Sequence, residues 1–206
     1  MSVVIETPEG VIYSDPTGGS DRYSGHPAPD VVLISHEHHD HFDVETLEGL
    51  LKNETQLVAP QYVIDSLPEG LRENAVSLAN GRQAEVGEIT VEAIPAYGIN
   101  AEAEQWHPPG RGNGYVVTVA GLRLYIAGST EATPEMLELD DIYLALLPLY
   151  PPYALGPGEA VTAVSTFLPQ FTYIYQYNSE ATRDDFLRRM EDDAPSARVV
   201  APDIAP

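Results

Sequence analysis

Apolar and polar positions along the chain follow two different periods, which predicts a mixture of strands and helices. Residues 30–35 form a β-branched, apolar run after Pro29, which is typical of a buried strand. Residues 84–94 alternate with a period of two, as expected for a hairpin. Leucines at helical spacing predict a helix over residues 44–52, with Asp43 as its N-cap.

The rest of the chain continues this interleaving of strands and helices. Further strands are predicted at residues 3–5, 11–13, 58–59, 114–119, 122–126, 142–147, 172–177 and 198–200. Further helices are predicted at residues 62–67 and 182–190, and another begins near Glu159. With 206 residues and 43% hydrophobic content, we expect an α/β fold with a single domain over residues 1–206.

Four of the six histidines lie within six residues that directly follow the strand at residues 30–35. These residues read His-Glu-His-His-Asp-His, from His36 to His41. A loop after a buried strand is where a rigid scaffold usually presents chemistry, and neutral imidazole is the commonest zinc ligand. The pattern predicts a metal site, with a solvated histidine-rich loop of incidental metal affinity as the alternative. Because the chain has no cysteine, histidine and carboxylate are its only strong ligands for transition metals.

The spacing His-x-His-x-Asp-His after an apolar strand resembles the signature of the metallo-β-lactamase superfamily. The resemblance continues through residues 96–115, 125–136 and 145–148, where the sequence is similar to the branch of ascorbate-6-phosphate-lactonase-like, small metal-dependent hydrolases. It covers the chain from about Val11 to Asn178. The family implies a four-layer αββα sandwich with the metal site at one edge, between the two sheets.

The resemblance also implies which residues bind metal. His36, His38 and His107 match the three histidines of the first site, and Asp40 and His41 match ligands of the second. The family carries an aspartate that bridges two ions where this chain has Ser129, and a histidine where it has Gln176.

A neutral hydroxyl or amide is a poor ligand for a transition metal, so we expect one tightly bound divalent ion. Zinc is the first expectation, with manganese, iron or nickel as alternatives. Freed from a complete second site, Asp40 becomes the candidate general base.

Two functions follow from this interpretation. The first is metal-dependent hydrolysis of a small ester, lactone or phosphoester by a water molecule that the ion activates. The second is a binding protein that keeps the fold and one ion but has lost turnover with the changes at Ser129 and Gln176.

Around the site, Trp106, Tyr150 and Tyr153 could line a substrate cleft or belong to the core, and Arg111 is a weaker candidate for contact with an anionic group.

The net charge of the chain indicates the salt concentration in which the protein works. Thirty-two acidic residues face ten basic ones, of which only Lys52 is lysine, and the formal net charge is −22. Such self-repulsion is best tolerated in concentrated salt, so we interpret the protein as halophilic, with an ordinary acidic protein as the alternative. We expect a small-molecule substrate and no nucleic-acid partner, because phosphate contacts need clustered lysine and arginine. Without a recognisable signal peptide or membrane span, a cytoplasmic location is expected.

Overall fold

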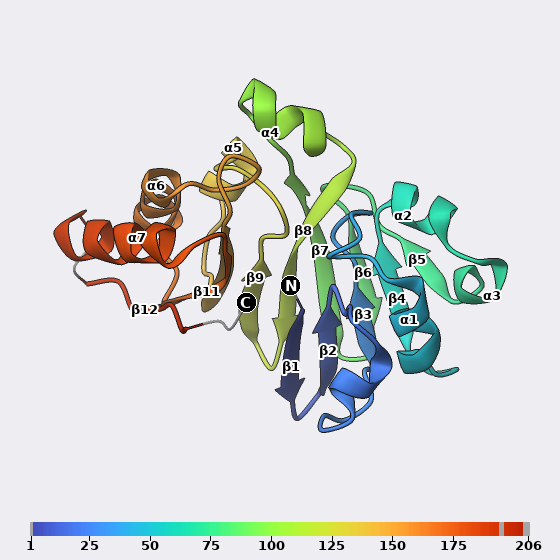
Figure 1. Cartoon of the computed structure of the whole chain (residues 1–206). Coiled ribbons are helices and arrows are strands. Elements are labelled where there is room, and N and C mark those ends of the chain that lie inside the picture. Colours follow the sequence, from blue (N-terminus) through green and yellow to red (C-terminus); the bar gives the residue numbers. More distant parts are fainter. Residues whose placement is uncertain (1, 194–195, 204–206) are drawn as a thin grey trace.

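Two β-sheets pack face to face in the computed structural model, which describes residues 2–193 and 196–203 (Figure 1). The first sheet contains, in spatial order, β1 (Val3–Thr7), β2 (Gly10–Ser14), β3 (Val31–Leu33), β4 (Gln56–Ala59) and β5 (Ala75–Ser77). The second contains, in spatial order, β12 (Val199–Val200), β11 (Phe171–Tyr177), β10 (Leu144–Leu149), β9 (Leu122–Ile126), β8 (Gly112–Val119), β7 (Ile89–Ala96) and β6 (Gln83–Val86).

Helices cover the outer face of each sheet, and α4 lies at one end of the sandwich (Figure 1). The helices are η1 (Ser20–Tyr23), α1 (Val44–Leu50), α2 (Gln61–Ser66), α3 (Glu69–Arg72), α4 (Ala101–Trp106), α5 (Pro134–Leu137), α6 (Pro157–Phe167) and α7 (Glu180–Asp193). The apolar side chains of α1 and α2 pack on the first sheet, and those of α5, α6 and α7 pack on the second. A third apolar cluster fills the space between the sheets. The predicted αββα sandwich is therefore confirmed (Figure 1).

Strand β3 shows why the run at residues 30–35 is apolar at successive positions. Val31 and Leu33 point into the core between the sheets, whereas Val32 and Ile34 pack against the layer of α1 and α2. All four side chains are fully buried. A strand that is covered on both faces needs apolar residues at every position, which is what the sequence provides.

The end of β3 is joined to the second sheet by backbone contacts. The Asn113 amide donates to the Ser35 carbonyl at 2.9 Å, and the Tyr115 hydroxyl donates to the Ile34 carbonyl at 2.7 Å. Gly128, with a φ of 67°, passes so close that an added Cβ would lie 2.9 Å from the Asn113 carbonyl oxygen. These contacts fix the segment that follows β3 at the edge where the two sheets meet.

Most of the predicted elements are present, with boundaries that differ by a few residues. Asp43 caps α1 by accepting a hydrogen bond from the Thr46 amide at 3.3 Å, as predicted. The elements that the apolar pattern did not predict are short: η1, α3, β5, α4 and α5. Such segments offer too few periodic positions to stand out in a sequence.

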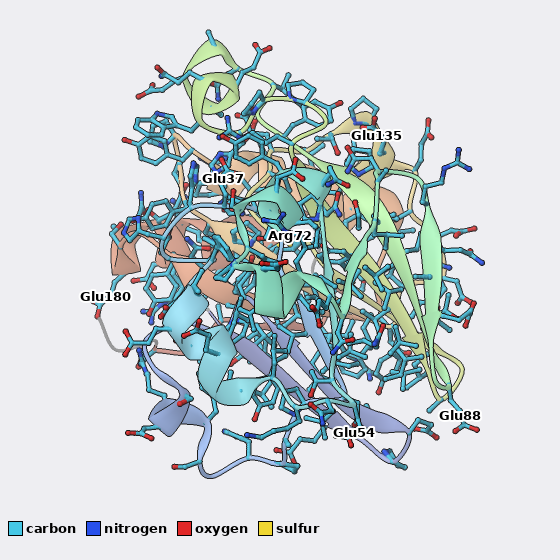
Figure 2. The ribbon with its side chains drawn as sticks, turned by 90° about the vertical axis from the view of Figure 1, so that its right-hand side faces the viewer. Glu37, Glu54, Arg72, Glu88, Glu135 and Glu180 are labelled. Carbon is cyan, nitrogen blue, oxygen red and sulfur yellow. The ribbon has the colours of Figure 1, made fainter. Side chains whose placement is uncertain are left out.

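The acidic side chains are spread over the molecule instead of being gathered in one place. Glu54, Glu88 and Glu180 are exposed and lie at widely separated points of the surface (Figure 2). None of the helices in the described part of the chain has the length and apolar character that a bilayer crossing requires.

Candidate metal centre

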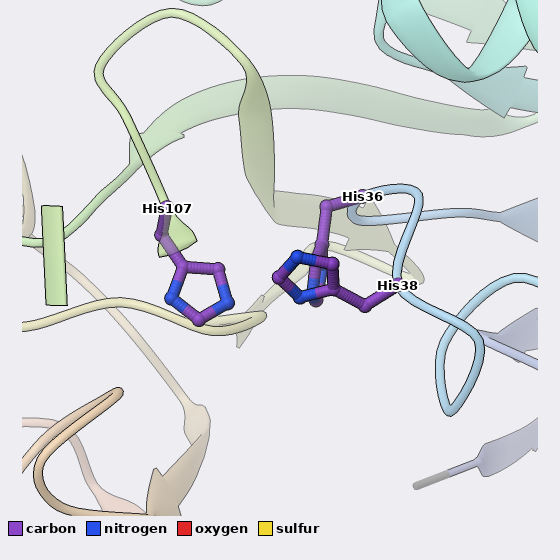
Figure 3. A group of neighbouring side chains, drawn as sticks. All are labelled: His36, His38 and His107. Atoms are coloured by element: carbon purple, nitrogen blue, oxygen red, sulfur yellow. The ribbon is translucent and has the colours of Figure 1, made fainter. Parts of the chain in front are cut away.

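Three histidines from two distant segments converge at the edge between the sheets. His36 and His38 lie on the loop after β3, and His107 is the C-cap of α4. One ring nitrogen from each lies within 4.8 Å of the other two, and the three rings face one another (Figure 3). Among residues 2–193 and 196–203, this is the group of histidine or carboxylate side chains with the geometry to hold an ion.

The ring nitrogens of this group differ in their partners. His36 Nε2 and His107 Nδ1 are buried and have no hydrogen-bond partner among the described residues. The other nitrogen of His36 lies 2.8 Å from Ser35 Oγ, and His107 also hydrogen-bonds to the Tyr153 backbone. In Figure 3, Nε2 of His107 faces the other two rings and Nδ1 points away from them. Buried polar atoms normally have partners, so the unpartnered Nε2 of His36, beside the other two rings, fits a ligand of a divalent ion.

Burial also keeps these rings in the form that binds metal. Burial, and then the neighbouring His38 and His41, lowers the pKa of His107 to about 4. Burial lowers the pKa of His36 well below its ordinary value, and it is also the main cause that lowers the pKa of His38. The three imidazoles are therefore neutral near pH 7, and a metal does not have to displace a proton from them.

A buried carboxylate that sequence reasoning missed supports the same loop. Asp15 follows β2 and accepts hydrogen bonds from the Ser35 amide at 2.7 Å, from Ser35 Oγ at 2.6 Å and from His41 Nδ1 at 2.7 Å. With Nδ1 donating to this carboxylate, His41 presents the lone pair of Nε2 to the pocket. The sequence shows that Asp15 follows an apolar strand. It does not show that this strand, β2, pairs in parallel with β3, and that pairing is what brings Asp15 to the metal loop.

The residues matched to a second metal site lie beside the first group. Asp40 Oδ2 is 3.6 Å from His41 Nε2, and Ser129 Oγ is 3.4 Å from the same nitrogen. Gln176 is buried, and its Oε1 has no hydrogen-bond partner within the described part of the chain. The fold thus brings every residue that the family pattern singled out to the edge of one pocket.

This pocket has a volume of about 270 Å³, and its lining is of two chemical kinds. The polar part includes the histidines and Asp40, and the aromatic part consists of Trp106, Tyr150 and Tyr153. The Trp106 and Tyr153 rings meet edge to face, with centroids 5.9 Å apart. Of the two interpretations of these aromatic residues, the structure therefore favours the cleft wall.

A second buried carboxylate, also missed from the sequence, holds the helix that carries Trp106 and His107. Glu131 is 3% exposed and accepts hydrogen bonds from the Ile99 amide at 2.5 Å and from the Asn100 amide at 2.7 Å. It also bonds to the Asn100 side chain, whose Oδ1 caps α4. Glu131 therefore fixes the start of α4 and, through that helix, the position of His107.

Arg111 does not line this pocket, but it lines a smaller cavity beside His36 and His107. Its guanidinium lies 2.6 Å from Glu37 Oε1 and stacks over the Tyr62 ring at 4.0 Å from the centroid. Sequence alone could not identify these partners. They leave Arg111 committed to holding the metal loop instead of meeting a ligand.

Comparisons with known proteins agree with this architecture. A family model described as the beta-lactamase superfamily domain matches residues 1–173. A crystal structure named as that of a metal-dependent hydrolase from Parabacteroides distasonis is 30% identical, with a TM-score of 0.87 over 99% of this chain and 90% of that one.

Two more distant proteins extend the comparison. A UPF0173 metal-dependent hydrolase of Lysinibacillus sphaericus is 26% identical over 86% of this chain and 82% of its own length. A metallo hydrolase of Ignicoccus hospitalis, 19% identical, has the same fold with a TM-score of 0.77 over 98% of this chain and 91% of that one.

Proposed function

The chain belongs to the metallo-β-lactamase superfamily, and on that premise we propose that it is a metal-dependent hydrolase with one divalent ion held by His36, His38 and His107. The observation that carries the proposal is the convergence of three imidazoles whose pKa values burial lowers, among them His36 with a buried, unpartnered Nε2. Zinc suits such a set of ligands best, with manganese, iron or nickel as alternatives. The substrate class is a small ester, lactone or phosphoester.

When bound, such an ion supplies Lewis-acid chemistry, because it lowers the pKa of a coordinated water from 15.7 to about 7 and polarises the scissile group. The chain supplies orientation and a proton acceptor. Ser35 Oγ holds Nδ1 of His36, which leaves Nε2 of that ring for the ion, and a hydrogen bond to the Tyr153 backbone helps to position the His107 ring. The Asp40 carboxylate lines the pocket and takes the proton that the attacking water loses.

A single ion follows from the chemistry of the residues that match the second metal site. His41 Nε2 and Asp40 are the strong ligands there, and Ser129 and Gln176 add only a hydroxyl and an amide. Two ligands hold a transition metal much less tightly than three or four. The second position therefore serves as a site for water or substrate.

The experiment combines metal analysis with turnover on a panel of small esters, lactones and phosphoesters. We expect about one tight equivalent of metal per chain after dialysis against a mild chelator, and hydrolysis that a strong chelator abolishes. His38→Ala should lose both metal and activity. His26→Ala is the matched control, because His26 is exposed and pairs with Glu6 at 2.9 Å. Two tight equivalents in the natural protein would contradict the single-ion assignment.

The rival function is a binding protein without turnover, which the neutral side chains at Ser129 and Gln176 favour. Asp40→Asn separates the two. In an enzyme it should abolish turnover with little loss of the ion, because Asp40 acts on the proton and not on the first three ligands. Wild-type protein that keeps its ion yet hydrolyses nothing in the panel would establish the binding function instead.

A further inference from the structure

The pocket beside the three histidines has no cationic side chain. Among the described residues that line it there is neither lysine nor arginine. Arg111 lies four residues after His107 along the chain, but Glu37 and Tyr62 hold its guanidinium. Sites that bind phosphate or carboxylate groups usually provide arginine or lysine, so this pocket lacks the usual counter-charge for an anionic ligand.

The local charge balance points the same way. Asp15 is buried behind His41, and Asp40 stands at the pocket edge, so two carboxylates lie near the three histidines. Together they offset the two positive charges of a divalent ion, and the charge of Arg111 is paired with that of Glu37. The chain as a whole carries a formal net charge of −22, which repels anions at longer range. A dianionic substrate therefore gains little from this environment.

The aromatic residues that line the pocket are accessible. Trp106 is 50% exposed and Tyr153 is 37% exposed, an unusual amount for large aromatic side chains. Both line the pocket, and Tyr150 lies beside Tyr153 with ring centroids 6.3 Å apart. Such a wall favours contact with an aromatic or alkyl group, and the volume of about 270 Å³ limits that group to a small molecule.

The remaining polar groups are neutral. Gln176 is 3% exposed, lines the pocket and leaves Oε1 without a hydrogen-bond partner among the described residues. A primary amide both donates and accepts, so it can bond to an uncharged carbonyl, hydroxyl or amide of a ligand. Ser129 adds a hydroxyl to the lining of the pocket.

Resting on the function proposed above, we infer that the pocket selects uncharged esters or lactones that carry a small aromatic or alkyl group. Trp106 and Tyr153 contact the apolar group, and Gln176 hydrogen-bonds to a neutral polar group of the substrate. Hydrolysis of such an ester consumes one water, whose oxygen bonds to the acyl carbon as the acyl–alkoxy bond breaks. One proton goes to the departing alcohol oxygen, and the acid product releases the other at neutral pH.

Trp106 is the only tryptophan, so its fluorescence reports binding without turnover. We would titrate metal-loaded protein with benzamide, benzoate and phenyl phosphate, which share one ring and differ in charge. We expect benzamide to bind at least tenfold more tightly than phenyl phosphate, with benzoate between them. Equal or tighter binding of phenyl phosphate would overturn the inference.

Two variants test the roles of the aromatic residue Tyr153 and of the Gln176 amide. Gln176→Ala should weaken benzamide binding at least fivefold and leave phenyl phosphate unchanged, while Gln61→Ala, at an exposed glutamine on α2, should change neither. Tyr153→Ala should remove most of the preference for benzamide over acetamide. If both variants bind benzamide as the wild type does, the assigned contacts are wrong.

Turnover separates this inference from the function on which it rests. Phenyl acetate should be hydrolysed with a much higher kcat/KM than phenyl phosphate. Faster hydrolysis of phenyl phosphate would refute the proposed selectivity but would support the proposed hydrolase function. Selective binding of benzamide with no turnover of any substrate would refute the hydrolase while keeping the preference for uncharged ligands.

Discussion

Replacing Asp15 with asparagine removes one buried negative charge while keeping the size of the side chain. Asp15 Oδ1 accepts from the Ser35 amide, and Oδ2 accepts from Ser35 Oγ and His41 Nδ1 at 2.6 and 2.7 Å. In the variant, an NH₂ group occupies the position of one oxygen. Because Asp15 has a φ of 46°, asparagine is the replacement that best tolerates the backbone.

The expected loss of stability follows from these contacts. Hydrogen bonds to a charged group contribute about 1.5–3 kcal/mol each, and breaking a buried charged pair costs about 3–5 kcal/mol. The Ser35 hydroxyl can rotate to accept from the new NH₂ group, whereas the His41 Nδ1–H keeps only its longer contact with Ser35 Oγ, at 3.4 Å. We therefore expect the free energy of unfolding to fall by about 2–4 kcal/mol.

Urea unfolding of the metal-free protein, followed by far-ultraviolet circular dichroism at fixed pH and salt, measures this loss. Asp65→Asn is the control, because Asp65 is exposed and bonds only locally to Gln61, so its effect should stay within about 0.5 kcal/mol. Nitrogen-15 NMR should also show that His41 moves its proton from Nδ1 to Nε2. A loss below about 0.5 kcal/mol with an unchanged tautomer would refute the assigned role of Asp15.

Four further predictions concern other parts of the site and the surface. Glu131→Gln should weaken metal binding several-fold, since the start of α4 loses an acceptor, whereas Glu135→Gln should not; competition with a coloured chelator measures both. Because the pKa of His107 is about 4 in the folded chain and 6.5 is its ordinary value, the unfolded chain binds a proton first as the pH falls. The free energy of unfolding of the metal-free protein should therefore drop between about pH 6.5 and 4, by up to about 3 kcal/mol, and urea titrations should show a smaller drop for His107→Gln. Ser129→Asp combined with Gln176→His should raise metal occupancy toward two ions, and elemental analysis showing no change would mean that the pocket itself has been remodelled. The melting temperature should rise from low salt to 1 M potassium chloride, where the Debye length is about 3 Å, and a flat response would remove the halophile interpretation.

The pattern of residues predicted strands and helices in an α/β fold, and the family resemblance implied the four layers. Residues 30–35 indicate a strand covered on both faces, and the alternation over residues 84–94 indicates the hairpin of β6 and β7. The order of strands in each sheet could not be predicted from the pattern. Apolar residues indicate that a strand is buried, but they do not indicate which strand lies beside it. Helix α4 could have been found, since Asn100 is a strong N-cap followed by alanine and glutamate, but six residues give little periodicity.

Part of the candidate site could be predicted from the sequence, and part could not. The sequence by itself determined that His36, His38, Asp40 and His41 share one loop after a buried strand, because covalent spacing keeps neighbours together whatever the rest of the chain does. The place of His107 beside them came from a family resemblance, and no local pattern could have supplied it.

Only the tertiary structure decided which distant side chains hold the site in shape. Asp15 reaches His41 across 26 residues, and Glu131 reaches Asn100 across 31. These contacts exist because parallel pairing sets β2 beside β3, and because the loop after β9 meets the start of α4. A carboxylate in a sequence is indistinguishable from a solvated one until folding buries it against its donors, so its role is a property of the fold.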